Sequence, residues 1–185
     1  MDLLKIVVFG PECTGKTTLT QKLSQHFQTS FSAEYIRHYL NARKIIFPEI
    51  EPFTVKWQDL SAIVTGQLAT EEQAMQAAGR VVFMDTNLLT SMVYIQHYFG
   101  ELPAWFPAQT IPKRYDHYLL LQPDIPWQAD PQRESEATRA LLFSVMAQKL
   151  QELNLPFTTI SGPYQHRVQQ AISVVSTLLN YPSGT

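Results

Sequence analysis

Hydrophobic residues along the chain alternate between short continuous runs and longer stretches in which they recur every three or four positions. A short continuous apolar run bounded by turn residues is typical of a strand that is buried on both faces. Such runs predict strands at Leu3–Phe9, Val81–Met84, His117–Leu121 and Phe157–Ile160, and a short further strand is expected to end near Ala33.

Segments with the helical period separate these predicted strands, because their apolar side chains fall on one helix face. The predicted helices are Lys16–Phe27, Tyr35–Arg43, Thr54–Ala78, Leu88–Phe99, Glu134–Leu153 and Tyr164–Leu179. Proline-containing stretches predict loops at Lys44–Phe53, Gly100–Arg114 and Gln122–Arg133. Strands that alternate with helices imply right-handed crossovers between parallel strands. The pattern therefore predicts an α/β protein with a three-layer α/β/α fold and a five-stranded parallel sheet.

Composition narrows the class of protein. A length of 185 residues predicts one domain spanning 1–185. The net charge of −2 and the sparse basic pairs argue against nucleic acid as a partner. No apolar stretch approaches the roughly 18 residues that a membrane span needs, and we expect no targeting signal, because the apolar run at Leu3–Phe9 is too short for a signal peptide. The single cysteine, Cys13, excludes an intramolecular disulfide and fits a reducing compartment, so we expect a cytoplasmic protein with no membrane partner.

The most specific motif lies between the first predicted strand and the first predicted helix. Gly10-Pro11-Glu12-Cys13-Thr14-Gly15-Lys16-Thr17 matches the phosphate-loop pattern G-x-x-x-x-G-K-[ST] in full. In such a loop the backbone N–H groups surround a phosphate, the lysine reaches the β- and γ-phosphates, and the final hydroxyl binds Mg²⁺. We therefore expect ATP and Mg²⁺ as cofactors. The predicted nucleotide-binding residues are Gly10, Glu12, Cys13, Thr14, Gly15, Lys16, Thr17 and Thr18.

Two carboxylates follow predicted strands, at the sheet edge where open α/β folds bind ligands. Asp85 comes directly after Val81–Met84 and is expected to hold Mg²⁺ together with Thr17, although Asp85 and Thr86 also suit the N-cap of the next helix. Glu34 follows the short second strand and is expected to accept the proton of an attacking hydroxyl, with Arg37 one helical turn away. The alternative for Glu34 is an exposed position at a helix start. The two carboxylates could also exchange the roles of base and metal ligand.

A segment at about 123–140 contains proline, tryptophan and arginine and resembles a lid. Kinases need such a lid, because water in an open site would take the phosphoryl group. Arg133 and Arg139 are candidates for neutralising charge on the transferring phosphoryl group, or they lie at a solvated helix start. Trp127 would stack on a flat ring or pack the lid down. The lid, together with the lack of a guanine-recognition motif, favours a small-molecule kinase over a GTPase.

Several further segments follow the phosphate loop in a recognisable order. They are Glu34-Tyr35-Ile36-Arg37-His38-Tyr39, Asp59 with Gln67, Asp85-Thr86-Asn87, Tyr115–Leu121 leading to Pro123–Trp127, Asp130 with Arg133, and Gly162 with Arg167. With these segments, nearly the whole chain resembles the ribosylnicotinamide kinase domain of NadR-type proteins. The family loop often has serine at the positions of Cys13 and Thr14, and the family often has aspartate at the position of Asn87.

This resemblance implies that ATP phosphorylates the 5′-hydroxyl of nicotinamide riboside, giving nicotinamide mononucleotide for NAD salvage. It implies catalytic roles for Lys16, Glu34, Asp85, Arg133 and Arg139, and substrate binding by Glu34, Tyr35, Arg37, Asp85, Asn87 and Trp127. The loop Ser161–Arg167 would border adenine, with Arg167 as a nucleotide-binding residue. Two alternatives stay open: a kinase for another nucleoside or small alcohol, and a non-enzymatic ATP-binding regulatory switch.

Overall fold

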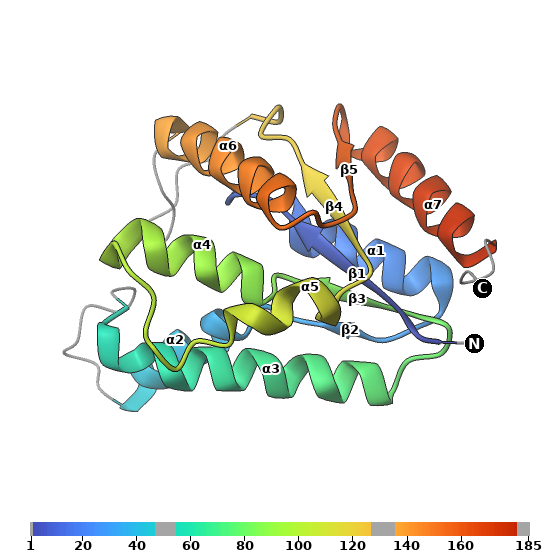
Figure 1. Ribbon diagram of the computed structural model, residues 1–185. Helices are drawn as coiled ribbons and strands as arrows, with labels where there is room; N and C mark the ends of the chain where they lie inside the picture. Colours follow the sequence, from blue (N-terminus) through green and yellow to red (C-terminus); the bar gives the residue numbers. More distant parts are fainter. Residues whose placement is uncertain (1, 47–54, 127–135, 181–185) are drawn as a thin grey trace.

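Five parallel strands lie side by side in the order β2-β3-β1-β4-β5 in a computed structural model, which describes residues 2–46, 55–126 and 136–180 (Figure 1). The strands are β1 Leu4–Phe9, β2 Phe31–Ser32, β3 Val81–Asp85, β4 His117–Leu121 and β5 Phe157–Ile160. The predicted five-stranded parallel sheet is thus confirmed, and each strand lies where its apolar run placed it.

The helices agree with the periodicity over most of their length. They are α1 Lys16–Phe27, α2 Tyr35–Ile46, α3 Leu60–Gln76, α4 Leu88–Phe99, α5 Ile111–Arg114, α6 Glu136–Glu152 and α7 Tyr164–Asn180. Three predictions were wrong in detail. The helix α2 continues to Ile46, where a loop was predicted from Lys44. The segment predicted as one loop over Gly100–Arg114 contains a 3₁₀ turn at Ala108–Thr110 and the short helix α5. The helix predicted from Thr54 begins at Leu60, after a 3₁₀ turn at Trp57–Asp59.

Helices cover both faces of the sheet, as the three-layer prediction requires. Successive side chains of a strand point to opposite faces. Val7 and Phe9 of β1 therefore join a core formed with α3, α4 and α6, whereas Ile6 and Val8 join a second core formed with α1 and α7. All four side chains are fully buried. No helix in the described part of the chain is long and apolar enough to cross a bilayer.

The strand order decides which loops meet at the carboxyl edge of the sheet. β1 pairs with β3 on one side and with β4 on the other. The phosphate loop, which we define as residues 10–17, therefore leaves the sheet between Asp85 at the end of β3 and the segment that follows β4. β2 pairs with β3 on its outer side, so Glu34 enters the same edge next to Asp85. Residues from four separate stretches of sequence thus converge on one point.

Candidate active site

The phosphate loop turns sharply at the end of β1. Gly10 has a φ of 147° and Gly15 a φ of 83°, and a Cβ at Gly10 would lie 2.9 Å from the carbonyl oxygen of Leu121. Cys13 also lies in the left-handed region, with a φ of 54°. Within the loop, Thr14 Oγ1 and Lys16 Nζ both donate hydrogen bonds to the carbonyl oxygen of Pro11, at 2.8 and 2.9 Å. Lys16 therefore lies over its own loop, as a lysine that contacts bound phosphates must.

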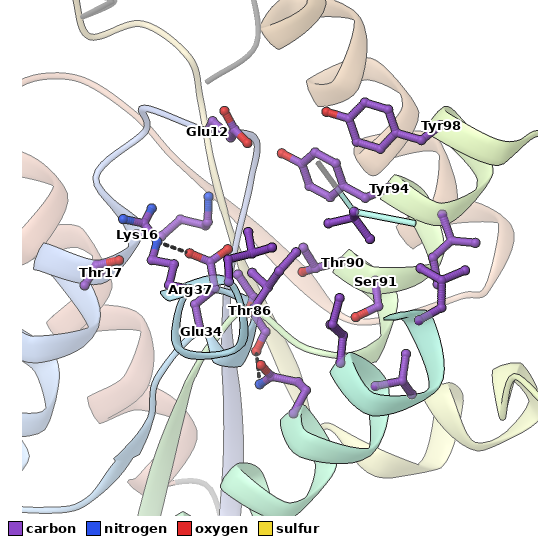
Figure 2. A pocket seen from close by; sticks show the side chains of 18 of the residues that line it. Glu12, Lys16, Thr17, Glu34, Arg37, Thr86, Thr90, Ser91, Tyr94 and Tyr98 are labelled. Carbon is purple, nitrogen blue, oxygen red and sulfur yellow. Dashed lines mark hydrogen bonds and ion pairs between the residues drawn. The ribbon is translucent and has the colours of Figure 1, made fainter. Parts of the chain in front are cut away.

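A cavity of about 530 Å³ extends from this loop into the space between α2, α3 and α4. Figure 2 shows Lys16 and Thr17 on one side of the cavity, and Tyr94 and Tyr98 on the other. The side near the loop is polar and is lined by Glu12, Cys13, Gly15, Lys16, Thr17, Thr18, Glu34 and Arg37. The far side is mostly apolar and is lined by Leu40, Val55, Leu60, Ile63, Val64, Tyr94, Ile95, Tyr98 and Phe99. One cavity thus joins a phosphate-binding end to an apolar chamber.

Glu34 lies between these two ends and is held in place from several sides. Its Oε2 lies 2.5 Å from Nε of Arg37, which confirms that one helical turn brings them together. Burial alone would lower the pKa of Arg37, but the carboxylate of Glu34 outweighs this and raises it. The buried side chain of Gln67 spans both flanks of Glu34: its Oε1 accepts from the backbone N–H of Tyr35 at 2.9 Å, and its Nε2 donates to Oγ of Ser32 at 3.4 Å.

Asp85 lies at the bottom of the site and is almost completely buried, at 1% exposure. Burial raises the pKa of Asp85, while nearby Lys16 and a hydrogen bond with Thr17 counteract this in part. Among the described residues, its Oδ1 has no hydrogen-bond partner. The N-cap of α4 is Asn87, whose side chain accepts from the N–H of Thr90 at 3.1 Å, so capping does not account for Asp85.

These features fit a Mg²⁺ ion, which prefers a few protein oxygens and completes its shell with water and phosphate. Asp85 supplies a buried carboxylate oxygen without a partner, and the Thr17 hydroxyl lies beside it. No group of three potential metal ligands occurs in the described ranges. A metal ion here would therefore depend on the phosphates of a bound nucleotide for part of its coordination.

Three residues expected to bind ligands are placed elsewhere by the structure. Asn87 is fully buried, and besides capping α4 it donates to the Tyr118 hydroxyl at 3.1 Å, so its side chain is not part of the cavity lining. Tyr35 is absent from that lining too, because its ring packs against Gly66 of α3, where a Cβ would overlap the ring. Arg167, expected near adenine, is 2% exposed and donates to backbone carbonyls.

Half of the predicted lid, the segment 127–135, lies outside the described residues, and Trp127, Asp130 and Arg133 belong to that segment. Arg139 belongs to α6 and is 4% exposed, so it is neither at a solvated helix start nor in the cavity lining. Its NH1 group donates to the carbonyl oxygens of Ile125 at 3.2 Å and Cys13 at 3.4 Å.

The residues of α4 that line the cavity are not among the predicted site residues, because the sequence pattern of this segment predicts only an apolar helix. Thr90, Tyr94 and Tyr98 follow one another at four-residue spacing, so they share one helix face. Thr86 and Ser91 also contribute to the lining. The polar residues at helical spacing, directly after a strand that ends in Asp85, were the signal that could have revealed this wall of the cavity.

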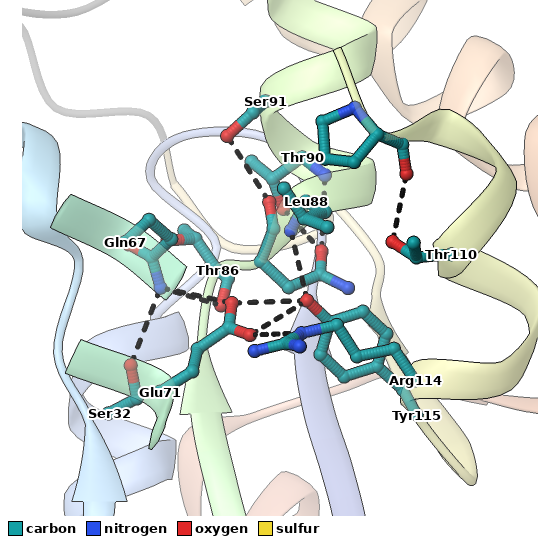
Figure 3. A network of polar contacts seen from close by, with 12 residues as sticks. Ser32, Gln67, Glu71, Thr86, Leu88, Thr90, Ser91, Thr110, Arg114 and Tyr115 are labelled. Atoms are coloured by element: carbon teal, nitrogen blue, oxygen red, sulfur yellow. Dashed lines mark hydrogen bonds and ion pairs between the residues drawn. The ribbon is translucent and has the colours of Figure 1, made fainter. Parts of the chain in front are cut away.

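A buried polar network supports this wall from below (Figure 3). The carboxylate of Glu71 is fully buried and accepts from Nε of Arg114 and from the Tyr115 hydroxyl, both at 2.9 Å. The same hydroxyl accepts from the backbone N–H of Leu88 at 3.3 Å, at the first residue of α4. The network thus connects α3 and α5 to the start of the helix that carries the cavity tyrosines.

Replacing Arg114 with glutamine is expected to destabilise the fold in a pH-dependent way. Burial raises the pKa of Glu71, and the ion pair with Arg114 lowers it in part. Removing Arg114 would therefore raise the pKa of Glu71 further. A raised folded-state pKa disfavours the ionised form, so the loss of stability is largest at neutral pH and shrinks as the pH falls through that pKa. We expect a loss of about 2 to 3 kcal/mol near pH 8, because Arg114 is partly exposed.

Urea unfolding of this Arg114→Gln variant at pH 8 and pH 5.5 measures the effect. A double variant that also carries Glu71→Gln removes the uncompensated charge and should recover part of the stability at pH 8. Equal losses at both pH values would show that Arg114 contributes through packing and not through the charge of Glu71.

Comparisons with known proteins agree with an α/β fold that carries a phosphate loop. A family model described as an AAA domain matches residues 5–167. The trifunctional NAD biosynthesis/regulator protein NadR of Salmonella typhimurium is 26% identical over 179 residues, which cover 94% of this chain and 42% of that protein. The NadR protein of Escherichia coli gives the same identity and coverage. The chain therefore spans less than half the length of these curated relatives.

Structures of NadR protein are also among the solved structures that resemble this chain. A crystal structure of NadR protein in complex with NR has a TM-score of 0.76 and 24% identity, covering 99% of this chain and 53% of that one. A structure of NadR in complex with NAD and AMP-PNP has a TM-score of 0.73 and 25% identity, and the match covers 99% of this chain and 51% of that one. A structure of deoxyadenosine kinase from M. mycoides with bound dATP has a TM-score of 0.60 and 13% identity, and the match covers 94% of this chain and 99% of that one. The expected kinase fold with a phosphate loop and the resemblance to NadR-type proteins are both confirmed.

Proposed function

The chain belongs to the AAA domain family, and from this premise we propose that it is an ATP-dependent kinase acting on the 5′-hydroxyl of nicotinamide riboside. One observation carries the proposal: a single cavity runs from the phosphate loop, past Glu34, into an aromatic and aliphatic chamber. A kinase needs this arrangement, because the γ-phosphate and the acceptor hydroxyl must meet in a water-poor space.

The phosphate loop is the proposed ATP site, and residues 10 and 12–17 of the loop, with Thr18 of α1, are the proposed nucleotide contacts. A NadR structure that resembles this chain contains AMP-PNP, an ATP analogue, which supports ATP as the donor. Thr17 and Asp85 are the residues that would hold Mg²⁺. When bound there, Mg²⁺ would supply positive charge to the phosphate oxygens. Lys16, whose Nζ donates to the Pro11 carbonyl of the same loop, would contribute further positive charge.

Glu34 is the proposed base, and Asp85 the proposed metal ligand. Glu34 lines the cavity, whereas Asp85 lies beneath Thr17 and is not part of the lining. In the reaction, the acceptor hydroxyl oxygen forms a bond to the γ-phosphorus while the bond from that phosphorus to the β-γ bridging oxygen breaks. The hydroxyl proton passes to the carboxylate of Glu34, and ADP leaves. Arg37 would keep that carboxylate oriented through their ion pair.

The far chamber supports nicotinamide riboside as the acceptor. Tyr94 and Tyr98 stack with their ring centroids 6.1 Å apart, and both line the cavity. Glu12 places a carboxylate in the lining of the same cavity. Aromatic faces together with a carboxylate attract a flat cation. Nicotinamide riboside carries such a cationic pyridinium ring, whereas adenine and cytosine nucleosides are neutral, and one similar NadR structure contains NR.

A substrate panel tests this function. The purified chain, ATP and Mg²⁺ are combined with nicotinamide riboside, deoxyadenosine or deoxycytidine, and ADP release is measured. We expect saturable turnover with nicotinamide riboside and turnover at least about tenfold lower with either deoxynucleoside, which corresponds to about 1.4 kcal/mol of discrimination. Turnover with a deoxynucleoside alone would instead identify a kinase for another nucleoside. ATP binding without acceptor-dependent turnover would identify a regulatory switch.

A further inference from the structure

Two arginines far apart in the sequence reach the phosphate loop from outside the cavity. Arg139 comes from α6 and Arg167 from α7, and their exposed fractions are only 4% and 2%. Neither side chain lines the cavity. A buried guanidinium is costly unless its N–H groups are hydrogen-bonded, so the partners of these two groups indicate what they do.

Arg167 makes contacts with three separate segments. Its Nε donates to the carbonyl oxygen of Gly162 at 2.7 Å, and its NH2 donates to that of Gln122 at 2.9 Å. Its NH1 donates to the carbonyl oxygen of Thr14, in the phosphate loop, at 3.1 Å. Asp124 forms an ion pair with the same guanidinium and also accepts from the N–H of Gly162 at 2.7 Å. The planar guanidinium thus connects the phosphate loop to the loops after β4 and β5.

Arg139 binds the phosphate loop in a similar way, through the carbonyl of the residue before Thr14. Its NH1 donates to the carbonyl oxygen of Cys13 at 3.4 Å and to that of Ile125 at 3.2 Å. The two arginines therefore hold the carbonyls of successive residues, Cys13 and Thr14. Cys13 has a φ of 54°, a conformation that costs a non-glycine residue about 1 to 2 kcal/mol and needs surrounding contacts to persist.

An arginine that holds a peptide carbonyl also orients the N–H group of the same peptide. In a trans peptide the carbonyl and the following N–H point in opposite directions in one plane. When Arg139 holds the carbonyl of Cys13, the N–H of Thr14 points away from the arginine. When Arg167 holds the carbonyl of Thr14, the N–H of Gly15 does the same. Hydrogen bonds in a chain also polarise one another, so a carbonyl bound to a cation makes its peptide N–H a stronger donor.

We propose that Arg139 and Arg167 are positioning residues that fix the Cys13–Thr14 and Thr14–Gly15 peptides, so that the N–H groups of Thr14 and Gly15 are oriented to bind phosphate. This inference rests on the proposed binding of ATP at the phosphate loop. It replaces the expected contact of Arg139 with the transferring phosphoryl group and the expected contact of Arg167 with the nucleotide. Each arginine acts through the backbone of the loop.

Binding of inorganic tripolyphosphate provides the test, because this probe uses the loop but has no adenine. Isothermal titration calorimetry with Mg²⁺ present would measure tripolyphosphate and ATP binding to the native chain, Arg139→Lys and Arg167→Lys. A lysine keeps the charge but cannot serve several carbonyls in a fixed plane. We expect the Kd for tripolyphosphate and for ATP to rise about tenfold in each variant, by a similar factor for both ligands.

Arg80→Lys is the matched control. Arg80 also donates from its guanidinium to a backbone carbonyl, that of Leu179 at 2.9 Å, but it is exposed and lies outside the site. Its variant should bind tripolyphosphate like the native chain. The KM for the acceptor should stay within about twofold of the native value in all three variants, because no acceptor contact changes.

Two results would overturn the inference. Weakened ATP binding with unchanged tripolyphosphate binding would place Arg167 in adenine recognition. Unchanged binding of both ligands in a variant of lowered thermal stability would show a structural role only. If Arg167→Lys does not fold, Arg139→Lys, which loses fewer contacts, decides the question. The proposed function is tested separately, because tripolyphosphate binding does not depend on which acceptor is phosphorylated.

Discussion

A Lys16→Ala variant is expected to lose ATP binding and kinase activity while keeping its fold. Lys16 Nζ donates a hydrogen bond to the Pro11 carbonyl, in the partly buried loop that lines the cavity. That ammonium group is placed to offset the charge of the β- and γ-phosphates, and such charge-assisted contacts strengthen in the transition state. We expect kcat/KM for ATP to fall by about 10²- to 10³-fold, the range for removing one electrostatic group of this kind.

Calorimetric ATP titration and steady-state kinetics measure both losses. Lys22→Ala serves as the matched control, because Lys22 lies on the exposed side of the same helix, α1. The thermal midpoints of both variants should stay near the native value. Unchanged nucleotide affinity in Lys16→Ala would contradict the assignment of the phosphate loop as the ATP site.

Replacing the two carboxylates one at a time is expected to separate the metal ligand from the base. Asp85→Asn should weaken the Mg²⁺ dependence of ATP binding and also reduce turnover, because its buried oxygen beside Thr17 is the proposed metal ligand. Glu34→Gln should reduce mainly kcat, by about 10²- to 10⁴-fold, the range for removing a general base. Its Mg²⁺ dependence should stay close to that of the native chain.

ADP release measured over a series of Mg²⁺ concentrations distinguishes these cases. Nucleotide-free Asp85→Asn is expected to be at least as stable as the native chain at neutral pH, because burial raises the pKa of Asp85 and its ionised form therefore opposes folding. An inactive variant with a normal thermal midpoint would thus be folded. A weakened Mg²⁺ dependence in Glu34→Gln but not in Asp85→Asn would reverse the two roles.

Local patterns in the sequence account for the parts of this site that were predicted. The phosphate loop joins a buried strand to a helix in one continuous stretch, so its motif specifies its structure directly. Asp85 and Glu34 were placed at the same edge because both follow predicted parallel strands, and the strand order confirms that placement. The ion pair of Glu34 with Arg37 follows from helical spacing.

The contacts that were not predicted join residues far apart in the sequence, and no local pattern spans such separations. Arg167 and Thr14 are 153 positions apart, and Arg139 and Cys13 are 126 apart. The lid-like segment made Arg139 a candidate for a phosphate contact, and the resemblance to NadR-type proteins made Arg167 a candidate for a contact near adenine. Their burial and backbone partners became visible only with α6 and α7 in place against the sheet. The same holds for Asn87, whose capping role depends on the exact start of α4.

The sequence by itself thus determined the succession of most strands and helices along the chain, the phosphate loop and the edge of the sheet that carries the candidate site. These features depend on hydrophobic periodicity and on contiguous motifs, which act over a few residues. Tertiary structure alone decided which side chains line the apolar end of the cavity, such as Tyr94 and Tyr98, and which arginines are buried outside it. The physical reason is that burial and hydrogen-bond partners are properties of packed elements, because a buried polar group must find its partner wherever the fold supplies one.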